Sequence, residues 1–206
     1  MSVKDTNVFE RGSDVADREN AERDLPVTVR RDVNTVLAGF GGQGILFMGK
    51  VIAYAGLLDG REVSWLPSYG PEMRGGTANC SVCISDAQIG CPLVTAPDAL
   101  IVMNQPSFEK FVPTVKPGGV IVVESSIITA KVECNNVAVH YVPATTLAEQ
   151  HGLKGLANII LMGKLLAAAG FCSVETMTET IKKIVPARKA HLIPKNIEAI
   201  ELGMKA

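Results

Sequence analysis

Short runs of apolar residues alternate along most of the chain with stretches in which apolar residues recur every three to four positions. The runs predict buried strands, and the spaced stretches predict helices that pack on them. Strands are expected at residues 33–38, 61–66, 77–85, 99–103, 120–123 and 137–142. Helices are expected at residues 44–58, 105–112, 145–150, 156–169, 174–185 and 197–204. Pro67 is expected to end the second strand, because proline cannot donate a hydrogen bond to a sheet.

Several of the expected strands are apolar at every position, which is typical of strands that are buried on both faces. Strands of this kind that alternate with helices indicate an α/β fold. We expect three α/β/α layers around a mostly parallel sheet, which can be mixed, similar to the Rossmann fold. No internal repeat or second core is visible, so a single domain is expected over residues 33–206.

The first 32 residues have a different composition from the rest of the chain. They carry 14 of the 41 charged residues and show no sustained apolar period, so a flexible charged tail is expected there. The other 174 residues carry 27 charges, which is sparse for the surface of a monomer of this size. The body of the chain is therefore expected to bury part of its apolar surface against partners.

The overall composition excludes several classes of protein. A net charge of −1 gives no electrostatic reason for binding nucleic acid. No charge-free apolar run is long enough for a membrane span, and the N-terminus does not resemble a signal peptide. Five cysteines without a framework of spacings indicate reduced thiols, so a cytoplasmic protein is expected.

A glycine-rich turn connects the first expected strand to the first expected helix. The sequence GFGGQG fits the pattern G-x-G-x-x-G, and its candidate binding residues are Gly39, Gly41, Gly42, Gln43 and Gly44. Glycine allows a phosphate to approach the backbone, and free N–H groups at a helix start favour an anion. A tight turn that serves only the packing of helix on strand is an equally good interpretation of the same residues.

A dinucleotide such as NAD or FAD would also require an acid at the end of the second strand. That strand is followed by Pro67 and carries no carboxylate at its end. Asp59 and Glu62 lie about where a spacing of roughly 20 residues would place the acid, but at the start of the strand. The dinucleotide interpretation is therefore weak.

The second strand leads into the loop SYGPEMRGG, residues 68–76. It contains three side chains suited to chemistry near an active site: Tyr69, Glu72 and Arg74. Arginine binds carboxylates and phosphates in a bidentate manner. A Glu72–Arg74 pair that only shapes the loop, or a loop that only contacts a partner, explains the residues as well.

Several of these segments occur in an order that resembles the γ subunit of 2-oxoacid:ferredoxin oxidoreductases. They are GFGGQG, SYGPEMRGG, TANCSVCIS, PGGVIVVESS and GLANIILMGKLLAA, and the resemblance extends over residues 35–200. It implies one subunit of an enzyme that converts a 2-oxoacid and coenzyme A into acyl-CoA, CO₂ and reduced ferredoxin. It also implies partner α and β subunits, in some enzymes a ferredoxin-like δ subunit, and ferredoxin as the electron acceptor.

The cofactors of such an enzyme are thiamine diphosphate with Mg²⁺ and [4Fe–4S] clusters, and the chain carries the sequence motif of neither. It has no G-D-G run and no C-x₂-C-x₂-C-x₃-C motif. Cys80 and Cys83 are three residues apart in an expected strand, so their side chains are expected on opposite faces. The cofactors are therefore expected in the partner subunits, and this chain is not expected to be active alone.

The resemblance leads to a hypothesis for the site. The turn at residues 39–44 would receive the pyrophosphate of coenzyme A, and the loop with Arg74 would lie near the thiamine site of the neighbouring subunits. Arg74 would bind a phosphate, a substrate carboxylate or an acid of a partner. The alternatives are a self-sufficient NAD- or FAD-dependent enzyme and a purely structural subunit. Overall likeness favours 2-oxoglutarate or a branched-chain 2-oxoacid over pyruvate.

One further polar residue lies at the start of the apolar stretch 156–169. Asn158 is expected to cap that helix, because asparagine side chains bond to free N–H groups at helix starts. The helix itself is apolar nearly all round, which predicts burial in the core or against another subunit.

Overall fold

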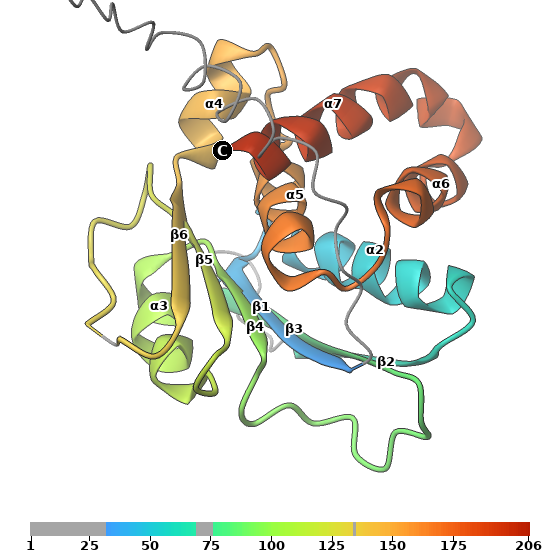
Figure 1. Ribbon diagram of the computed structural model, residues 1–206. Helices are drawn as coiled ribbons and strands as arrows, with labels where there is room; N and C mark the ends of the chain where they lie inside the picture. Colours follow the sequence, from blue (N-terminus) through green and yellow to red (C-terminus); the bar gives the residue numbers. More distant parts are fainter. Residues whose placement is uncertain (1–31, 69–75, 134) are drawn as a thin grey trace, which may run out of the picture.

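The structure, a computed structural model, describes residues 32–68, 76–133 and 135–206. Within these residues a six-stranded sheet has the strand order β2-β3-β1-β4-β5-β6 (Figure 1). The strands are β1 (Val33–Phe40), β2 (Glu62–Ser68), β3 (Thr77–Ser85), β4 (Ala99–Val102), β5 (Val120–Glu124) and β6 (Ala138–Val142). The expected charged tail, residues 1–32, lies outside the described residues except for its last one.

The sheet is mixed, with one reversed strand near its edge. β1 is parallel to β4, β4 to β5, and β5 to β6. β3 is antiparallel to both of its neighbours, β1 and β2. β2 therefore runs in the same direction as β1, and among the described strands β3 alone is reversed. The expected mostly parallel sheet is confirmed.

Helices cover both faces of the sheet (Figure 1). They are α2 (Ile45–Leu58), α3 (Gln105–Phe111), α4 (Ala144–Gln150), α5 (Ala157–Ala169), α6 (Val174–Ile184) and α7 (Ile193–Lys205), with short 3₁₀ helices at Val112–Thr114 and Ala187–Leu192. α2 and α5 pack on one face, α6 packs on α2, and α7 packs on α5. α3 packs on the opposite face, where Phe108 belongs to a second apolar core together with Leu100 and Ile121. The three expected layers are confirmed.

α5 is buried over most of its surface because it lies between the sheet and α7. Its residues contact β4 and β5 on one side and α7 on the other. Six of its large apolar side chains and the backbone at Gly163 are buried between the sheet and α7. The six side chains are Ile159, Ile160, Leu161, Met162, Leu165 and Leu166. The apolar character of this helix is therefore satisfied inside the chain.

Most element boundaries differ from the expectation by one or two residues, and two of the differences have a clear physical reason. β2 continues through Pro67 to Ser68, so the prediction that Pro67 ends the strand is wrong. β2 is an edge strand, and an edge strand tolerates proline because the missing N–H group is not needed on its open side. α7 begins at Ile193 and not at residue 197, since Pro194 fits the first turn of a helix.

No helix in the described part of the chain is both long enough and apolar enough to cross a membrane.

Candidate functional site

The connections that follow β1 and β4 leave the sheet on opposite faces. α2 follows β1 on the face that also carries α5, and α3 follows β4 on the other face (Figure 1). Where neighbouring parallel strands diverge in this way, α/β proteins bind ligands outside the carboxyl ends of the strands. The predicted glycine turn, residues 39–44, lies at this edge of the sheet. This edge is therefore the candidate site.

Gln43 fixes the glycine turn to the sheet. Its Oε1 accepts a hydrogen bond from the Phe40 N–H (2.6 Å), and its Nε2 donates to the Met103 carbonyl (3.1 Å). Met103 directly follows β4, so one side chain connects the ends of two neighbouring strands. The Gly41 N–H donates to the Gly76 carbonyl (3.1 Å), just before β3. Gln43 thus has a structural role in the turn, and its side chain is not free to bind a ligand.

The glycines of the turn are required for different reasons. A Cβ atom at Gly39 would lie 2.6 Å from the Gln43 Oε1, which is too close. Gly42 and Gly44 have φ angles of 95° and 80°, which favour glycine. A Cβ atom at Gly44 would also collide with the Asn158 side chain, whereas the space beside Gly42 is open. Packing therefore explains Gly39 and Gly44, and Gly42 lies on the accessible side of the turn.

Asn158 extends from the first turn of α5 to the glycine turn. Its Nδ2 donates to the Gly44 carbonyl at 3.4 Å, and the residue is buried. α5 begins after Leu156 and has no side-chain cap. The prediction that Asn158 caps its own helix is therefore wrong, because its amide points across to the start of α2.

The glycine turn leaves backbone donors free. Within the part of the chain that the structure describes, five backbone N–H groups in and after the turn have no hydrogen-bond acceptor. They are those of Gly42, Gly44, Ile45, Leu46 and Phe47. The first bond inside α2 is donated by the Met48 N–H to the Gly44 carbonyl (3.0 Å). The first turn of α2 contains no acidic residue. Free donors at the positive end of a helix dipole favour an anion, so this turn can bind a phosphate group.

The loop that connects β2 to β3 begins and ends at the same edge of the sheet as the glycine turn. Ser68 pairs with Asn79, and Phe40 pairs with Thr77, so β1 and β2 end at the same edge of the sheet. This agrees with the expectation that the loop leaves from the carboxyl edge. Its three candidate side chains lie outside the described residues: Tyr69, Glu72 and Arg74.

Two buried polar side chains at the same edge were not singled out from the sequence. Asn104 follows β4, and its Oδ1 accepts a hydrogen bond from the Ser107 N–H (2.8 Å) at the start of α3. The Glu124 carboxylate at the end of β5 accepts hydrogen bonds from the N–H groups of Ser126 (2.8 Å) and Thr145 (3.1 Å). In the sequence, both Asn104 and Glu124 come directly after an apolar run, and this pattern could have drawn attention to them. Both residues support helix starts, so neither side chain is assigned to chemistry.

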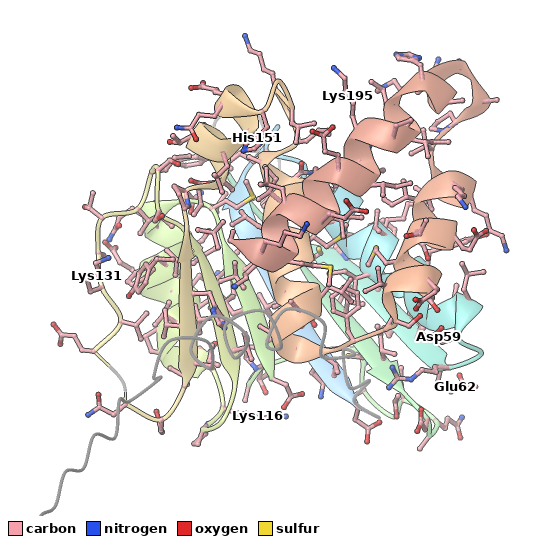
Figure 2. All side chains as sticks on the ribbon, turned by 45° about the horizontal axis from the view of Figure 1, so that its top comes forward. Asp59, Glu62, Lys116, Lys131, His151 and Lys195 are labelled. Carbon is pink, nitrogen blue, oxygen red and sulfur yellow. The ribbon has the colours of Figure 1, made fainter. Side chains whose placement is uncertain are left out.

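The position of β3 argues against a dinucleotide. In dinucleotide-binding folds the second strand lies next to the first. Here β3 separates them, so the end of β2 is two strand spacings, roughly 10 Å, from the end of β1. Asp59 and Glu62 lie together at the side of the molecule away from His151, which follows α4 at the carboxyl edge (Figure 2). Neither acid can therefore hold a ribose beside the glycine turn.

The cysteines of β3 do not form a metal site. Cys80 points toward α2, where burial raises the pKa of its thiol to about 12. Cys83 lies on the opposite face, in contact with the Pro92 carbonyl, so the expected opposite orientation is confirmed. Across residues 32–68, 76–133 and 135–206, no group of three His, Cys, Asp or Glu side chains could hold a metal ion. The described residues thus do not supply the ligands of an iron–sulfur cluster.

Comparisons of the sequence and of the structure with known proteins point to the same family. A family model described as pyruvate ferredoxin/flavodoxin oxidoreductase matches residues 34–206. The ketoisovalerate oxidoreductase subunit VorA of Methanothermobacter thermautotrophicus is 40% identical over 174 residues, which cover 84% of this chain and 36% of that protein. The chain thus spans about a third of the length of this relative.

Two other similar proteins match over nearly their whole length. The 2-oxoglutarate synthase subunit KorC of Methanothermobacter marburgensis is 36% identical over 174 residues, which cover 81% of this chain and 92% of that protein. The γ subunit of a keto/oxoacid ferredoxin oxidoreductase from Geobacter sulfurreducens has a similar structure, with a TM-score of 0.74 and 28% identity. That match covers 85% of this chain and 96% of the other.

Proposed function

The chain belongs to the pyruvate ferredoxin/flavodoxin oxidoreductase family, and we propose that it is the γ-type component of a multi-subunit 2-oxoacid:ferredoxin oxidoreductase. This enzyme would convert a 2-oxoacid and coenzyme A into acyl-CoA, CO₂ and reduced ferredoxin in the cytoplasm. Residues 33–206 would form the working domain, with residues 1–32 as a separate charged segment. The relatives are themselves named as subunits, which supports action within a complex.

The substrate is proposed to be 2-oxoglutarate or a branched-chain 2-oxoacid. Two relatives with 40% and 36% identity are named for ketoisovalerate and for 2-oxoglutarate.

The contribution of this chain is to bind the pyrophosphate of coenzyme A at the glycine turn. The observation that carries this proposal is the set of free N–H groups at Gly42, Gly44 and the first turn of α2. Gly42 offers open space for the approach of a ligand. The turn is already fixed by Gln43 and Asn158, so little conformational entropy would be lost on binding. Arg74, with Tyr69 and Glu72, is proposed to reach the active site formed with the partners.

Thiamine diphosphate, Mg²⁺ and [4Fe–4S] clusters are proposed to reside in the partner α and β subunits and, where present, a ferredoxin-like δ subunit. The residues of this chain do not fit these groups, since the sequence lacks their motifs and the described residues form no metal-ligand set. Large apolar side chains are partly exposed beside the glycine turn and on the edge strand: Phe40, Phe47, Trp65 and Leu66. We place the contact with the partner subunits on this surface.

The test compares Phe47→Glu with Phe47→Gln in the reconstituted complex. Phe47 lies in the first turn of α2 and is 37% exposed. The two replacements have nearly the same shape, but glutamate brings a negative charge to the donors that would hold the pyrophosphate. We expect the KM for coenzyme A to rise at least several-fold more in Phe47→Glu than in Phe47→Gln, with the KM for the 2-oxoacid unchanged.

Size-exclusion chromatography of both complexes separates binding from assembly. If both variants assemble and show the same KM for coenzyme A, the turn does not bind the pyrophosphate and the subunit is a scaffold at this edge. A second variant, Arg74→Ala, tests the loop. Unchanged kinetics for both substrates in an intact complex would exclude a role of Arg74 at the active site.

A further inference from the structure

Cys83 and Cys91 have no role in the proposed function, yet they lie close together. Cys83 is on β3, on the face opposite α2, and is only 3% exposed. Cys91 lies in the irregular segment 86–98 between β3 and β4, and its side chain is exposed. Cys80 and Cys172, in contrast, are buried in the core between the sheet and the helices.

The segment 86–98 brings Cys91 to Cys83. The Cys83 thiol donates to the carbonyl of Pro92 at 3.9 Å. Pro92 directly follows Cys91, and the Cα atoms of neighbouring residues are about 3.8 Å apart. Cys91 therefore lies near the Cys83 side chain. Cys91 is also near enough to act on Cys83 electrostatically: burial first, and then the charges of Cys91 and Asp98, raise the pKa of the Cys83 thiol.

The segment can adjust without breaking regular structure. It forms neither helix nor strand between Asp86 and Asp98, and the space beside Gly90 is open. Disulfide formation requires Cα atoms about 4.4–6.8 Å apart, and the residues around Cys91 can move toward β3 without breaking a helix or strand. Cys83 is fixed in the sheet by the pairing of β3 with both neighbours.

We propose that Cys83 and Cys91 are a redox-active thiol pair that forms a reversible disulfide and fixes the segment 86–98 to β3. The oxidant is a low-molecular-weight disulfide. The exposed Cys91 thiolate attacks one of its sulfurs, forms a mixed disulfide and releases one thiol. Cys83 then attacks the sulfur of Cys91, forms the internal disulfide and releases the second thiol. Two protein thiols are oxidised and one external disulfide is reduced to two thiols.

This inference does not depend on the proposed function, and its test needs only the purified full chain. Cys134, which lies outside the described residues, is replaced by serine in every protein to remove a competing thiol. The protein is treated with oxidised glutathione, alkylated and cleaved before Asp86. That cut separates Cys83 from Cys91, so a disulfide between them holds two peptides together.

We expect the linked peptides in the oxidised protein and their loss after reduction. In Cys83→Ser the mixed glutathione adduct should persist on Cys91, because the second thiol is missing. In Cys91→Ser neither adduct nor disulfide should form at Cys83, which solvent does not reach. A glutathione adduct that persists on Cys91 while Cys83 is present, a disulfide between two chains, or a link to Cys80 would each overturn the proposal.

Discussion

Gly163 of α5 lies directly against the backbone carbonyl of Ile200 in α7. A Cβ atom at this glycine would overlap with that carbonyl oxygen. The relation is reciprocal, because a Cβ atom at Gly203 of α7 would overlap with the carbonyl of Ile160 in α5. The two helices therefore cross at a pair of glycines, and this contact lets α7 cover the outer side of α5.

The contact predicts that Gly163→Ala destabilises the protein. In an open helix the change from glycine to alanine would stabilise by about 1 kcal/mol through helix propensity. Here the added methyl group must push α7 away from α5, and overpacking of this kind costs typically about 1–3 kcal/mol. We expect a net decrease in the free energy of unfolding, measured by chemical denaturation.

Ala167→Gly provides the matched control on the same helix. Ala167 is exposed, so its replacement reports helix propensity without the contact. It should cost roughly 1 kcal/mol. If Gly163→Ala proves more stable than the wild type, the two helices do not meet as described.

Apolar spacing was enough to predict most elements and the burial of α5, but not what covers that helix. A helix that is apolar all round can lie in a core or against another subunit, and its own residues do not distinguish these. α7 can cover α5 only because Gly163 and Gly203 let the two helices approach closely. These glycines are 40 residues apart and belong to no periodic pattern that could be recognised in the sequence. The reversal of β3 had a usable signal. Eight residues connect β2 to β3, too few for a parallel crossover.

The glycine turn was predictable as a candidate site, but the roles of its residues were not. Gln43 was grouped with the ligand-binding residues because it lies inside the motif. Its side chain is instead committed to Phe40 and Met103, and Met103 is 60 residues away in the sequence. Asn158 shows the same limit, since local rules suggest a cap and the tertiary contact with Gly44 decides otherwise.

The role of Gln43 predicts that Gln43→Ala weakens the fold around the turn. The Phe40 N–H and the Met103 carbonyl would lose their partner. Since the first bond is exposed and the second is part-buried, we expect the cost of an ordinary hydrogen bond, about 0.5–1.5 kcal/mol. We expect lower stability to denaturant and faster hydrogen exchange at Phe40. Gln105→Ala is the control, because Gln105 is exposed and, among the described residues, its side chain bonds to Glu109 alone. Equal stability of the two variants would contradict the role of Gln43.

Asp98 predicts a specific loss of stability in acid. Burial raises the pKa of this carboxyl, but the hydrogen bonds from Lys116 and Asn34 and the charge of Lys116 outweigh it and hold the pKa below its usual range. Since the folded pKa is lower than the unfolded one, about 3.9, the stabilisation is complete above that value. It is lost as the pH falls through the folded pKa.

Asp98→Asn isolates this contribution from the other carboxyl groups. The free energy of unfolding of the wild type should exceed that of the variant at about pH 6, and the difference should shrink as the pH falls below about 4. A difference that stays constant down to about pH 3 would show that Asp98 does not titrate in this range.

The contact between Gly44 and Asn158 predicts that their substitutions are coupled. Gly42→Ala and Gly44→Ala impose a similar backbone strain, since both positions have positive φ angles, at a cost of about 1–3 kcal/mol each. Only Gly44→Ala also brings a methyl group against the Asn158 amide. Gly44→Ala should therefore destabilise the protein more than Gly42→Ala, as measured by chemical denaturation.

Asn158→Ala removes the side chain that the methyl group meets, so it should recover part of the stability lost in Gly44→Ala. When Asn158→Ala is combined with Gly42→Ala, the two effects on stability should be additive, because the space beside Gly42 is open and Asn158 does not reach it. We expect a coupling energy of at least about 0.5 kcal/mol in the first double-mutant cycle and near zero in the second. Equal coupling in both cycles would mean that Asn158 acts on α5 alone, and that the glycine turn is held by the sheet without it.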